Sequence, residues 1–169
     1  MTGYGEAMAT NDTDAVRSLE RVLEGQRFAM VTTSSPKGLR ARPLTLLEQE
    51  DADLRFLVSK ESEWVRELAA PVASVQVSFA DPGENTYVAL QGHATLDDSR
   101  DAVRRVWNPA AEAFFEGPDD PNAVVLECTI FDGEWWDAPS TKVGMAIAFA
   151  KRAVTGDEPG QSGIVDPEA

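Results

Sequence analysis

Extended segments rich in β-branched, aromatic or alternating apolar residues recur along the whole chain, and they predict β-strands. We expect seven of them, at residues 27–33, 39–49, 54–58, 72–80, 86–96, 123–131 and 134–136. Turn residues rich in Gly, Pro, Ser and Asp separate many of these segments, including Ser34 to Gly38 and Asp81 to Asn85. Asp132-Gly133 is a further hairpin signal between the last two segments. The strands should therefore pair as antiparallel hairpins.

Helical spacing of apolar residues interrupts this pattern in a few places. It predicts a first helix over 14–24, one over 59–70 carrying Trp64, Val65 and Leu68, one from a cap at 97–99 through Trp107, and one from Pro109 through Phe115. A last helical pattern covers 141–153, and residues 117–122 read as irregular. Short helices are therefore inserted between strands rather than alternating with them.

This arrangement predicts a mainly β fold: a closed β-barrel with inserted helices, antiparallel, with six or seven strands. A chain of 169 residues suits one such domain. We expect a flexible N-terminus at 1–13, the barrel domain at 14–139, a C-terminal helix at 140–154 and a disordered tail at 155–169.

Composition excludes several classes of partner and site. The net charge of −14 argues against nucleic acid and against an anionic membrane surface, since both require a basic face. No apolar run approaches the length of a membrane span, and the polar N-terminus does not resemble a secretory signal, so we expect a cytoplasmic protein. Cys128 and His93 are the only residues of their types, which excludes an intrachain disulfide and a thiolate zinc site. We expect no metal and a buried, structural Cys128.

Arg40 and Arg42 lie two residues apart on a predicted strand, so both side chains share one face. The planar guanidinium donates paired hydrogen bonds to phosphate, and the following Pro43 is typical of an edge strand or a bulge. The pair is therefore a candidate anion clamp. A solvated strand face explains the same two arginines.

The segment Val58-Ser59-Lys60-Glu61-Ser62 places a lysine and two hydroxyls where a predicted strand ends and a helix begins. A helix N-terminus carries unpaired N–H groups and partial positive charge, which favours phosphate. The alternative is an ordinary helix cap by Ser59 or Ser62.

The order of the motifs resembles one known family. The strings are Phe28 to Thr32, Arg40 to Leu44, Phe56 to Ser62, Tyr87 to Ala94, Val106 to Pro109, Phe114-Phe115 followed by Asp120-Pro121, and Trp135-Trp136-Asp137. Together they resemble the general-stress-protein branch of the pyridoxamine 5′-phosphate oxidase-like, FMN-binding split-barrel family. The resemblance implies an FMN-binding split barrel, with FAD as an alternative cofactor, and a homodimer with two equivalent sites.

The resemblance also implies the residues of the site. Arg42, Lys60 and Ser62 would hold the flavin phosphate, with Arg40 as a weaker addition. The backbone around Pro43, Leu44, Val58 and Ser59 would face the ring system. Gln91 and Gly92 would lie near its pyrimidine edge, and Trp107 and Trp136 would close the site, one of them from across a twofold interface. One departure is Trp64, which stands where family members tend to carry a lysine.

Three functions remain open at this stage. The first is a flavin-dependent redox protein with unspecified electron donor and acceptor, the second a flavin- or anion-binding module without turnover, and the third a cofactor-free dimeric barrel. Oxidation of pyridoxamine phosphate is not expected, because acidic Asp137 and then Ala138-Pro139 stand where the true oxidases carry a basic strand.

Overall fold

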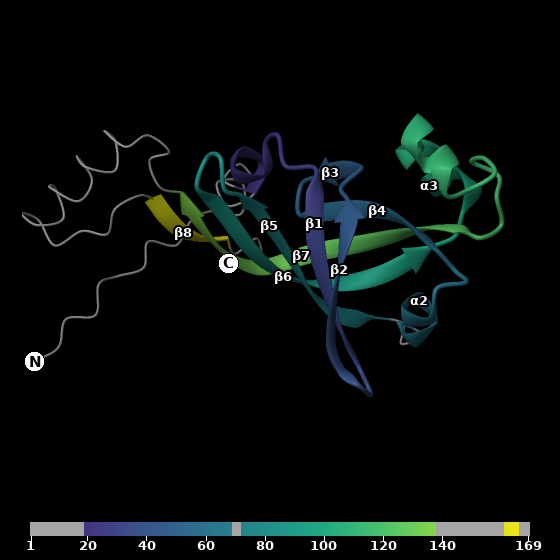
Figure 1. The fold of residues 1–169 in the computed structure, drawn as a ribbon, viewed down its shortest axis with the longest axis horizontal. Helices are drawn as coiled ribbons and strands as arrows, with labels where there is room; N and C mark the ends of the chain where they lie inside the picture. Colours follow the sequence, from purple (N-terminus) through teal and green to yellow (C-terminus); the bar gives the residue numbers. More distant parts are fainter. Residues whose placement is uncertain (1–18, 69–71, 138–160, 166–169) are drawn as a thin grey trace, which may run out of the picture.

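The computed structural model describes residues 19–68, 72–137 and 161–165. They form one antiparallel sheet in the order β2-β1-β5-β6-β7-β4-β3, and β8 pairs with β7 beside this path (Figure 1). The strands are β1 Phe28–Ser35, β2 Gly38–Thr45, β3 Glu48–Glu50, β4 Asp53–Ser59, β5 Ala73–Asp81, β6 Thr86–Asp97, β7 Ala123–Asp137 and β8 Gln161–Val165. The short helices are α2 Glu63–Glu67, α3 Arg100–Val106 and the 3-10 helix η1 Pro109–Ala113, and residues 19–23 are also helical.

The core lies on the concave face of the curled sheet. Alternate residues of each strand point to opposite faces, and in β4 the even positions Leu54, Phe56 and Val58 are buried. Partners from β1, β5, β6 and β7 join them, together with Leu19 and Leu23 of the first helix. Cys128 belongs to this core and is fully buried, as expected from its apolar surroundings.

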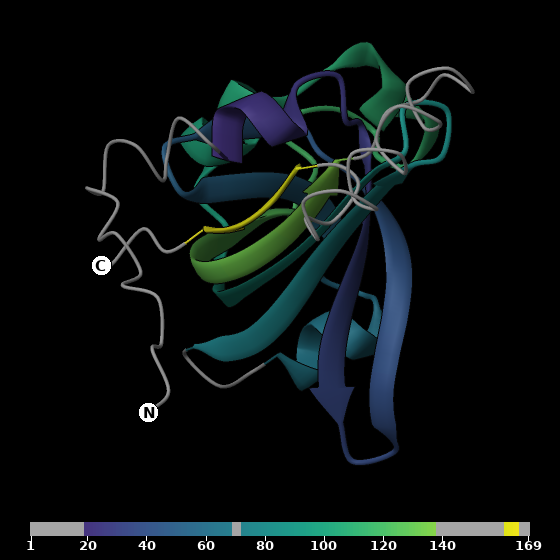
Figure 2. The same ribbon diagram turned by 90° about the vertical axis from the view of Figure 1, so that its left-hand side faces the viewer.

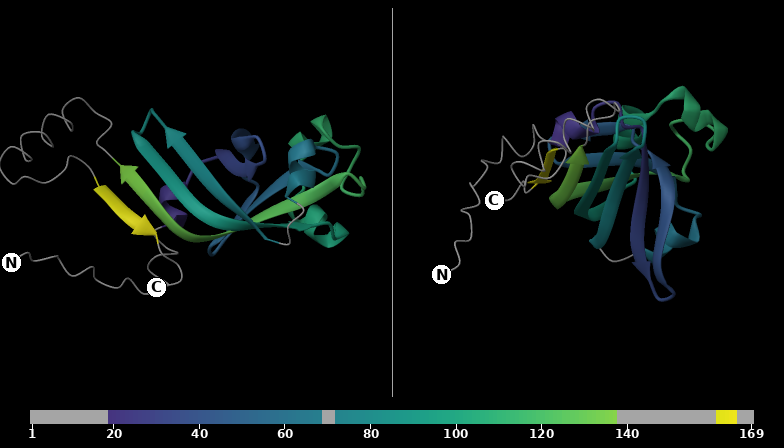
Figure 3. Two further views of the ribbon diagram at one scale, coloured as in Figure 1. Left: turned by 90° about the horizontal axis from the view of Figure 1, so that it is seen from below. Right: turned by 60° about the vertical axis from the view of Figure 1, so that its left-hand side comes forward.

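Among the described residues, the convex face is covered over only part of its width. Val103 and Val106 of α3 pack on Ala123 and Val125 of β7 in a second, smaller cluster. Figure 3 shows β5, β6 and β7 side by side, with β8 at one end of β7 and α3 toward the other. The convex face of β1, β5 and β6 keeps large exposed side chains, namely Phe28, Met30 and Tyr87.

The sheet curls into a split barrel, so the mainly β, antiparallel fold class expected from the sequence is confirmed, but the closed barrel expected there is wrong. β2 and β3 stand at the two ends of the strand order, and no ladder in the described residues joins them (Figure 2). The barrel is therefore split along β2 on one side and along β3 and β4 on the other. The end of β2 and the end of β4, which lie on either side of the β2–β3 connection in the sequence, therefore both border this split.

The expected hairpin at Asp132-Gly133 is wrong, because β7 continues through it as one strand of 15 residues. Gln91 pairs with Asp132 and Gly92 with Ile130, so Phe131 is an extra residue at a β-bulge. A bulge shifts the inward-facing positions by one. The hydrophobic pattern of the sequence breaks there in the same way as at a turn.

Three boundaries also differ from expectation. The single strand expected at 39–49 divides into β2 and β3, and the helix expected at 59–70 is the shorter α2, with 69–71 outside the described residues. In the tail expected to be disordered, residues 161–165 form β8 on β7. The expected flexible segment at 1–13 and the C-terminal helix at 140–154 lie outside the described residues.

Candidate functional site

A cavity of about 390 Å³ lies in the split of the barrel. Four elements and their adjoining residues contribute to its wall: the end of β2, the end of β4, the entry to α2, and η1. The lining residues are Pro43, Leu44, Thr45, Leu47, Leu57, Val58, Ser59, Ser62, Trp64, Asn108, Ala110, Ala111, Phe114 and Phe115. The volume lies in the range of small-molecule sites, which are mostly apolar with a few placed polar groups.

β2 borders this cavity as an edge strand. It is the first strand in the order and pairs only with β1 in the described ladders, so one row of its backbone groups has no strand partner. Pro43 lies on this strand and lines the cavity, and of the edge strand and the bulge that it indicated, the strand order shows the edge. Backbone groups of β2 can therefore hydrogen-bond to a ligand.

The serines after β4 are positioned by a tight turn. The Ser62 N–H donates to the Ser59 carbonyl at 3.1 Å, and the Glu61 N–H donates to Ser59 Oγ at 3.2 Å. Ser62 is the N-cap of α2, but its side chain makes no capping hydrogen bond. Both serines line the cavity. The ordinary-cap explanation therefore does not account for Ser62, whose hydroxyl can serve a ligand.

Arg42 lies behind Trp64 rather than on the cavity wall. Its Nη1 donates to Thr33 Oγ1 at 2.9 Å, and its Cζ is 4.2 Å from the centroid of the Trp64 ring. This is a cation–π contact. Partial burial lowers the pKa of Arg42, and the nearby Glu67 carboxylate opposes that shift. The guanidinium is thus partly desolvated and fixed by two neighbours.

Lys60 points away toward the start of α3. Its Nζ lies 2.9 Å from Asp98 Oδ2, and this ion pair lowers the pKa of Asp98. Arg40 is exposed on β2 near the hairpin turn. Lys60 and Arg40 are not among the lining residues, and neither is Arg42. Of Arg42, Lys60 and Ser62, which were expected at the phosphate, only Ser62 therefore lies on the wall.

The remaining expected residues lie elsewhere in this chain. Exposed Gln91 donates to Asp132 Oδ2 at 3.2 Å, and buried Gly92 of β6 lies opposite the bulge on β7. Trp107 packs on Phe115 with ring centroids 6.4 Å apart, one residue removed from the wall. Trp136 is twelve residues along β7 from Val124, the partner of Val58, and is not among the residues that line the cavity.

The η1 segment is the part of the wall that the sequence analysis did not assign to the site. Asn108 Oδ1 accepts from the Ala110 N–H at 2.9 Å and starts this short helix, and Phe114 after it is 82% exposed. An exposed phenylalanine beside a cavity is a signal that only the structure supplies. The Asn108-Pro109 string and the Phe114-Phe115 pair had marked the segment, but without a role.

The wall formed by the described residues offers hydrogen bonds and apolar surface, but no acid or base. Its polar side chains are Thr45, Ser59, Ser62 and Asn108. Cys128 lies in the core, where burial raises the pKa of its thiol to about 12, so it is no thiolate nucleophile at neutral pH. Chemistry at this cavity would depend on the bound group.

No described helix is long and apolar enough to span a bilayer.

Comparison with known proteins gives consistent matches. The sequence profile of the family described as "Pyridoxamine 5′-phosphate oxidase like" matches residues 14–160. General stress protein 26 of Bacillus subtilis is 37% identical over 119 residues, which cover 69% of this chain and 84% of that protein. Protein bli-3 of Neurospora crassa is 24% identical over 154 residues, covering 83% of this chain and 73% of that protein.

A solved structure shares the fold at low sequence identity. The general stress FMN/FAD binding protein from Xanthomonas citri superposes with a TM-score of 0.66 at 23% identity. The match covers 76% of this chain and 92% of that one.

Proposed function

Because the chain belongs to the pyridoxamine 5′-phosphate oxidase-like family, we propose that it binds a flavin nucleotide in the cavity between β2 and β4. One observation carries the proposal. Pro43, Leu44, Val58, Ser59 and Ser62, which the motif order assigned to a flavin from separate stretches of sequence, converge on one cavity. The similar Xanthomonas citri protein is described as binding FMN or FAD.

The residues of the wall fit a flavin. Leu44, Leu57 and Val58 provide apolar surface for the ring system, and the β2 edge provides backbone groups for its polar rim. The Ser62 hydroxyl, which does not cap α2, is available to a phosphate oxygen. FMN and FAD share the ring and the first phosphate, so both are candidates, with FMN implied by the motifs. When bound, the flavin would supply the electron transfer.

We place this flavin site in a homodimer, in the cytoplasm. Pro43 of the wall pairs with Met30 on β1, so both side chains lie on the convex face that α3 leaves uncovered. Trp136 of β7 and Tyr87 of β6, each 43% exposed, pair with one another on the same face. A second copy against this face would border the cavity and bring Trp136 toward the site from the partner.

A flavin-dependent redox protein is the first reading, and a binding module without turnover is the second. The second is favoured by one observation, namely that no lining side chain titrates near neutral pH. Steady-state oxidation of NADH and NADPH by the flavin-loaded protein distinguishes the two. Turnover above that of free flavin supports the redox reading, and its absence with bound flavin supports the module.

Flavin binding itself is tested by blocking the cavity. Ala110 is exposed on η1 and lines the cavity, whereas Ala113 is exposed on the same helix and does not. By calorimetric titration with FMN and FAD, Ala110→Trp should weaken binding at least about tenfold, because the indole fills space that the ring needs. Ala113→Trp should bind like the wild type. The proposal fails if the wild type binds neither flavin or if the two variants behave alike.

A further inference from the structure

Two walls of the cavity are attached to one loop, residues 117–122, which does not itself line the cavity. The first is the turn after β4, which carries Ser59 and Ser62. Within this turn the Lys60 N–H donates to the Asn122 carbonyl at 2.9 Å. The end of the loop therefore anchors the turn that places both serines on the wall.

The second wall attached to this loop is the segment after η1. Phe114 and Phe115 line the cavity, and the N–H of the next residue, Glu116, donates to Asp120 Oδ2 at 3.0 Å. The other carboxylate oxygen, Oδ1, accepts from the Asn122 N–H at 2.8 Å. These hydrogen bonds lower the pKa of Asp120, so its carboxylate is charged at neutral pH and holds both ends of the loop.

Arg100, the first residue of α3, binds the backbone of this loop. Its Nη1 donates to the Asp120 carbonyl at 2.6 Å, and its Nη2 donates to the carbonyls of Ala123 at 2.8 Å and Asp98 at 2.9 Å. The Pro118 carbonyl lies 3.5 Å from Nη1. Arginine suits this role because its rigid fork of N–H donors serves several acceptors at once. One guanidinium thus joins the loop to the start of α3 and to the start of β7.

The neighbouring Arg104 of α3 makes a different kind of contact with the same loop. Its Nη2 lies 2.6 Å from Asp119 Oδ1, and the two side chains are 53% and 69% exposed. An exposed ion pair contributes little, because water competes for both charges. Arg104 is therefore a matched control, since it reaches the loop through a carboxylate and not through backbone carbonyls.

We propose that Arg100 is a positioning residue of the flavin site: through the loop at 117–122 it fixes the serine turn and the η1 segment relative to one another. The inference rests on the proposed function, because flavin is the ligand whose binding it affects. A wall that is fixed before binding reduces the ordering cost that the ligand would otherwise meet. Arg100 therefore acts on binding although it is not among the lining residues.

Calorimetric titration of the full-length protein with FMN and FAD compares Arg100→Ala with Arg104→Ala. Arg100→Ala should bind flavin about tenfold or more weakly than the wild type, the effect of losing one charge-assisted hydrogen bond from the support of the wall. Arg104→Ala should stay within about twofold of the wild type. Equal binding by a folded Arg100→Ala overturns the inference and leaves the flavin site intact. A wild type that binds neither flavin overturns the proposed function instead.

Chemical rescue separates positioning from a general loss of stability. In Arg100→Ala that circular dichroism shows to be folded, added ethylguanidinium should restore flavin affinity, because it can donate to the same carbonyls. Ethylammonium at the same concentration should not, because it has the charge without the planar fork. Rescue by both cations, or by neither, contradicts the role assigned to the guanidinium.

Hydrogen exchange in the wild type provides a test that needs no variant. Coupling between two sites is reciprocal, so a loop that positions the walls must itself be stabilised when flavin binds between them. Amide exchange in peptides covering residues 116–122 should therefore slow on saturation with flavin, although these residues do not line the cavity. Exchange that is unchanged in this loop while flavin is bound overturns the inference.

Discussion

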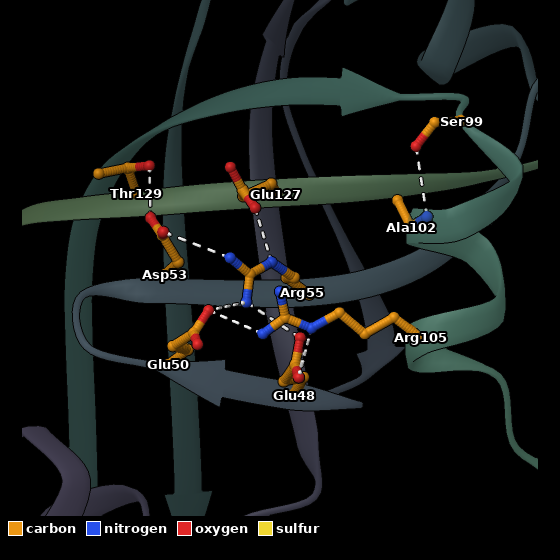
Figure 4. A network of polar contacts seen from close by, with 9 residues as sticks. All are labelled: Glu48, Glu50, Asp53, Arg55, Ser99, Ala102, Arg105, Glu127 and Thr129. Atoms are coloured by element: carbon orange, nitrogen blue, oxygen red, sulfur yellow. Dashed lines mark hydrogen bonds and ion pairs between the residues drawn. The ribbon is translucent and has the colours of Figure 1, made fainter.

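At the scale of single residues, the described side chain with the most ion pairs is Arg55 on β4. Its guanidinium contacts four carboxylates, Glu127 at 2.6 Å, Glu48 at 2.9 Å, Glu50 at 3.1 Å and Asp53 at 3.5 Å (Figure 4). The Arg55 side chain is only 11% exposed. Arg105 of α3 also binds Glu48 and Glu50 and so ties the helix to β3. This network covers the convex face beside the cavity without entering it.

Loss of the Arg55 charge should destabilise the fold. Arg55→Met keeps most of the stem but leaves four neighbouring carboxylates to repel one another, and we expect a loss of about 1–3 kcal/mol in unfolding free energy, since these carboxylates are partly solvated. Arg105→Met, at a more exposed cation of the same network, should cost less. Urea unfolding at pH 7 measures both. An equal loss in the two variants would contradict the central place of Arg55.

The loss of unfolding free energy in Arg55→Met should also depend on pH. Hydrogen bonds from Arg105 and Arg55 lower the pKa of Glu50 below its ordinary 4.5. A carboxyl whose pKa is lower in the folded state stabilises the fold above its ordinary value and loses that contribution as pH falls through the lowered pKa. The stability difference between wild type and Arg55→Met should therefore be full at pH 7 and narrow below about pH 4.5. Urea unfolding across pH 3–7 measures this stability difference. A difference that grows as the pH falls would exclude the lowered pKa of Glu50 as its cause.

At the scale of elements, the bulge on β7 depends on a glycine in the neighbouring strand. A Cβ added to Gly92 of β6 would lie 2.7 Å from the Thr129 carbonyl oxygen, closer than real contacts allow. Gly117, in the loop before β7, has nothing within 4 Å of the same added atom. The backbones of β6 and β7 thus approach each other at Gly92 in a way that only glycine permits.

Gly92→Ala should therefore be destabilising by about 1–3 kcal/mol. The added methyl group would meet a backbone oxygen of β7, which cannot rotate away as a side chain can, so the strand itself must shift. Gly117→Ala should leave the unfolding free energy within about 0.5 kcal/mol of the wild type, as is usual for surface substitutions. Chemical denaturation of the three proteins provides the measurement. If Gly92→Ala is as stable as the control, the close approach at the bulge does not constrain the fold.

The elements also show what the sequence could predict. A strand such as β5 was predicted because small or apolar residues alternate with polar ones, and its burial alternates in the same way. Pro43 indicated an edge strand or a bulge on β2, and the strand order shows the edge. The bulge at Phe131 was missed because an extra residue breaks the alternation just before Asp132-Gly133, a pair with strong turn preference. Local pattern cannot distinguish a bulge from a turn when the partner strand that continues the ladder is distant in sequence.

The residues of the candidate site could likewise be predicted from the sequence only in part. Motif order indicated residues on both sides of the split, since Pro43 and Ser62 each stand in a recognisable string. The orientation of Arg42 and Lys60 could not be predicted, because it depends on Trp64 and Asp98, which approach them only through the fold. The contribution of η1 also depends on tertiary packing.

At the scale of the whole molecule, the convex face that the described helices leave uncovered is the surface on which we place the proposed dimer contact. Phe28 is 67% exposed and Met30 43%, both on β1, and Tyr87 and Trp136 extend the apolar surface onto β6 and β7. Apolar surface of this kind, gathered on one sheet face, is typical of protein interfaces. The net charge of −14 repels two copies at long range, so apolar contact must supply the attraction.

A charge on this face should therefore dissociate the proposed dimer and weaken the proposed flavin binding together. Met30→Glu places a carboxylate beside Pro43 on the convex face, where a partner would have to desolvate it. Leu96→Glu is the matched control, because Leu96 is similarly exposed at 40% but shares the opposite face of β6 with the core residues Leu90 and Ala94. Light scattering after size exclusion should give twice 18.3 kDa for the wild type and the control, and 18.3 kDa for Met30→Glu. Calorimetry should then show weaker flavin binding only in the monomeric variant, because in the proposed dimer one wall of the site comes from the second copy. A Met30→Glu monomer that binds flavin as well as the wild type would mean that each cavity is complete within its own chain.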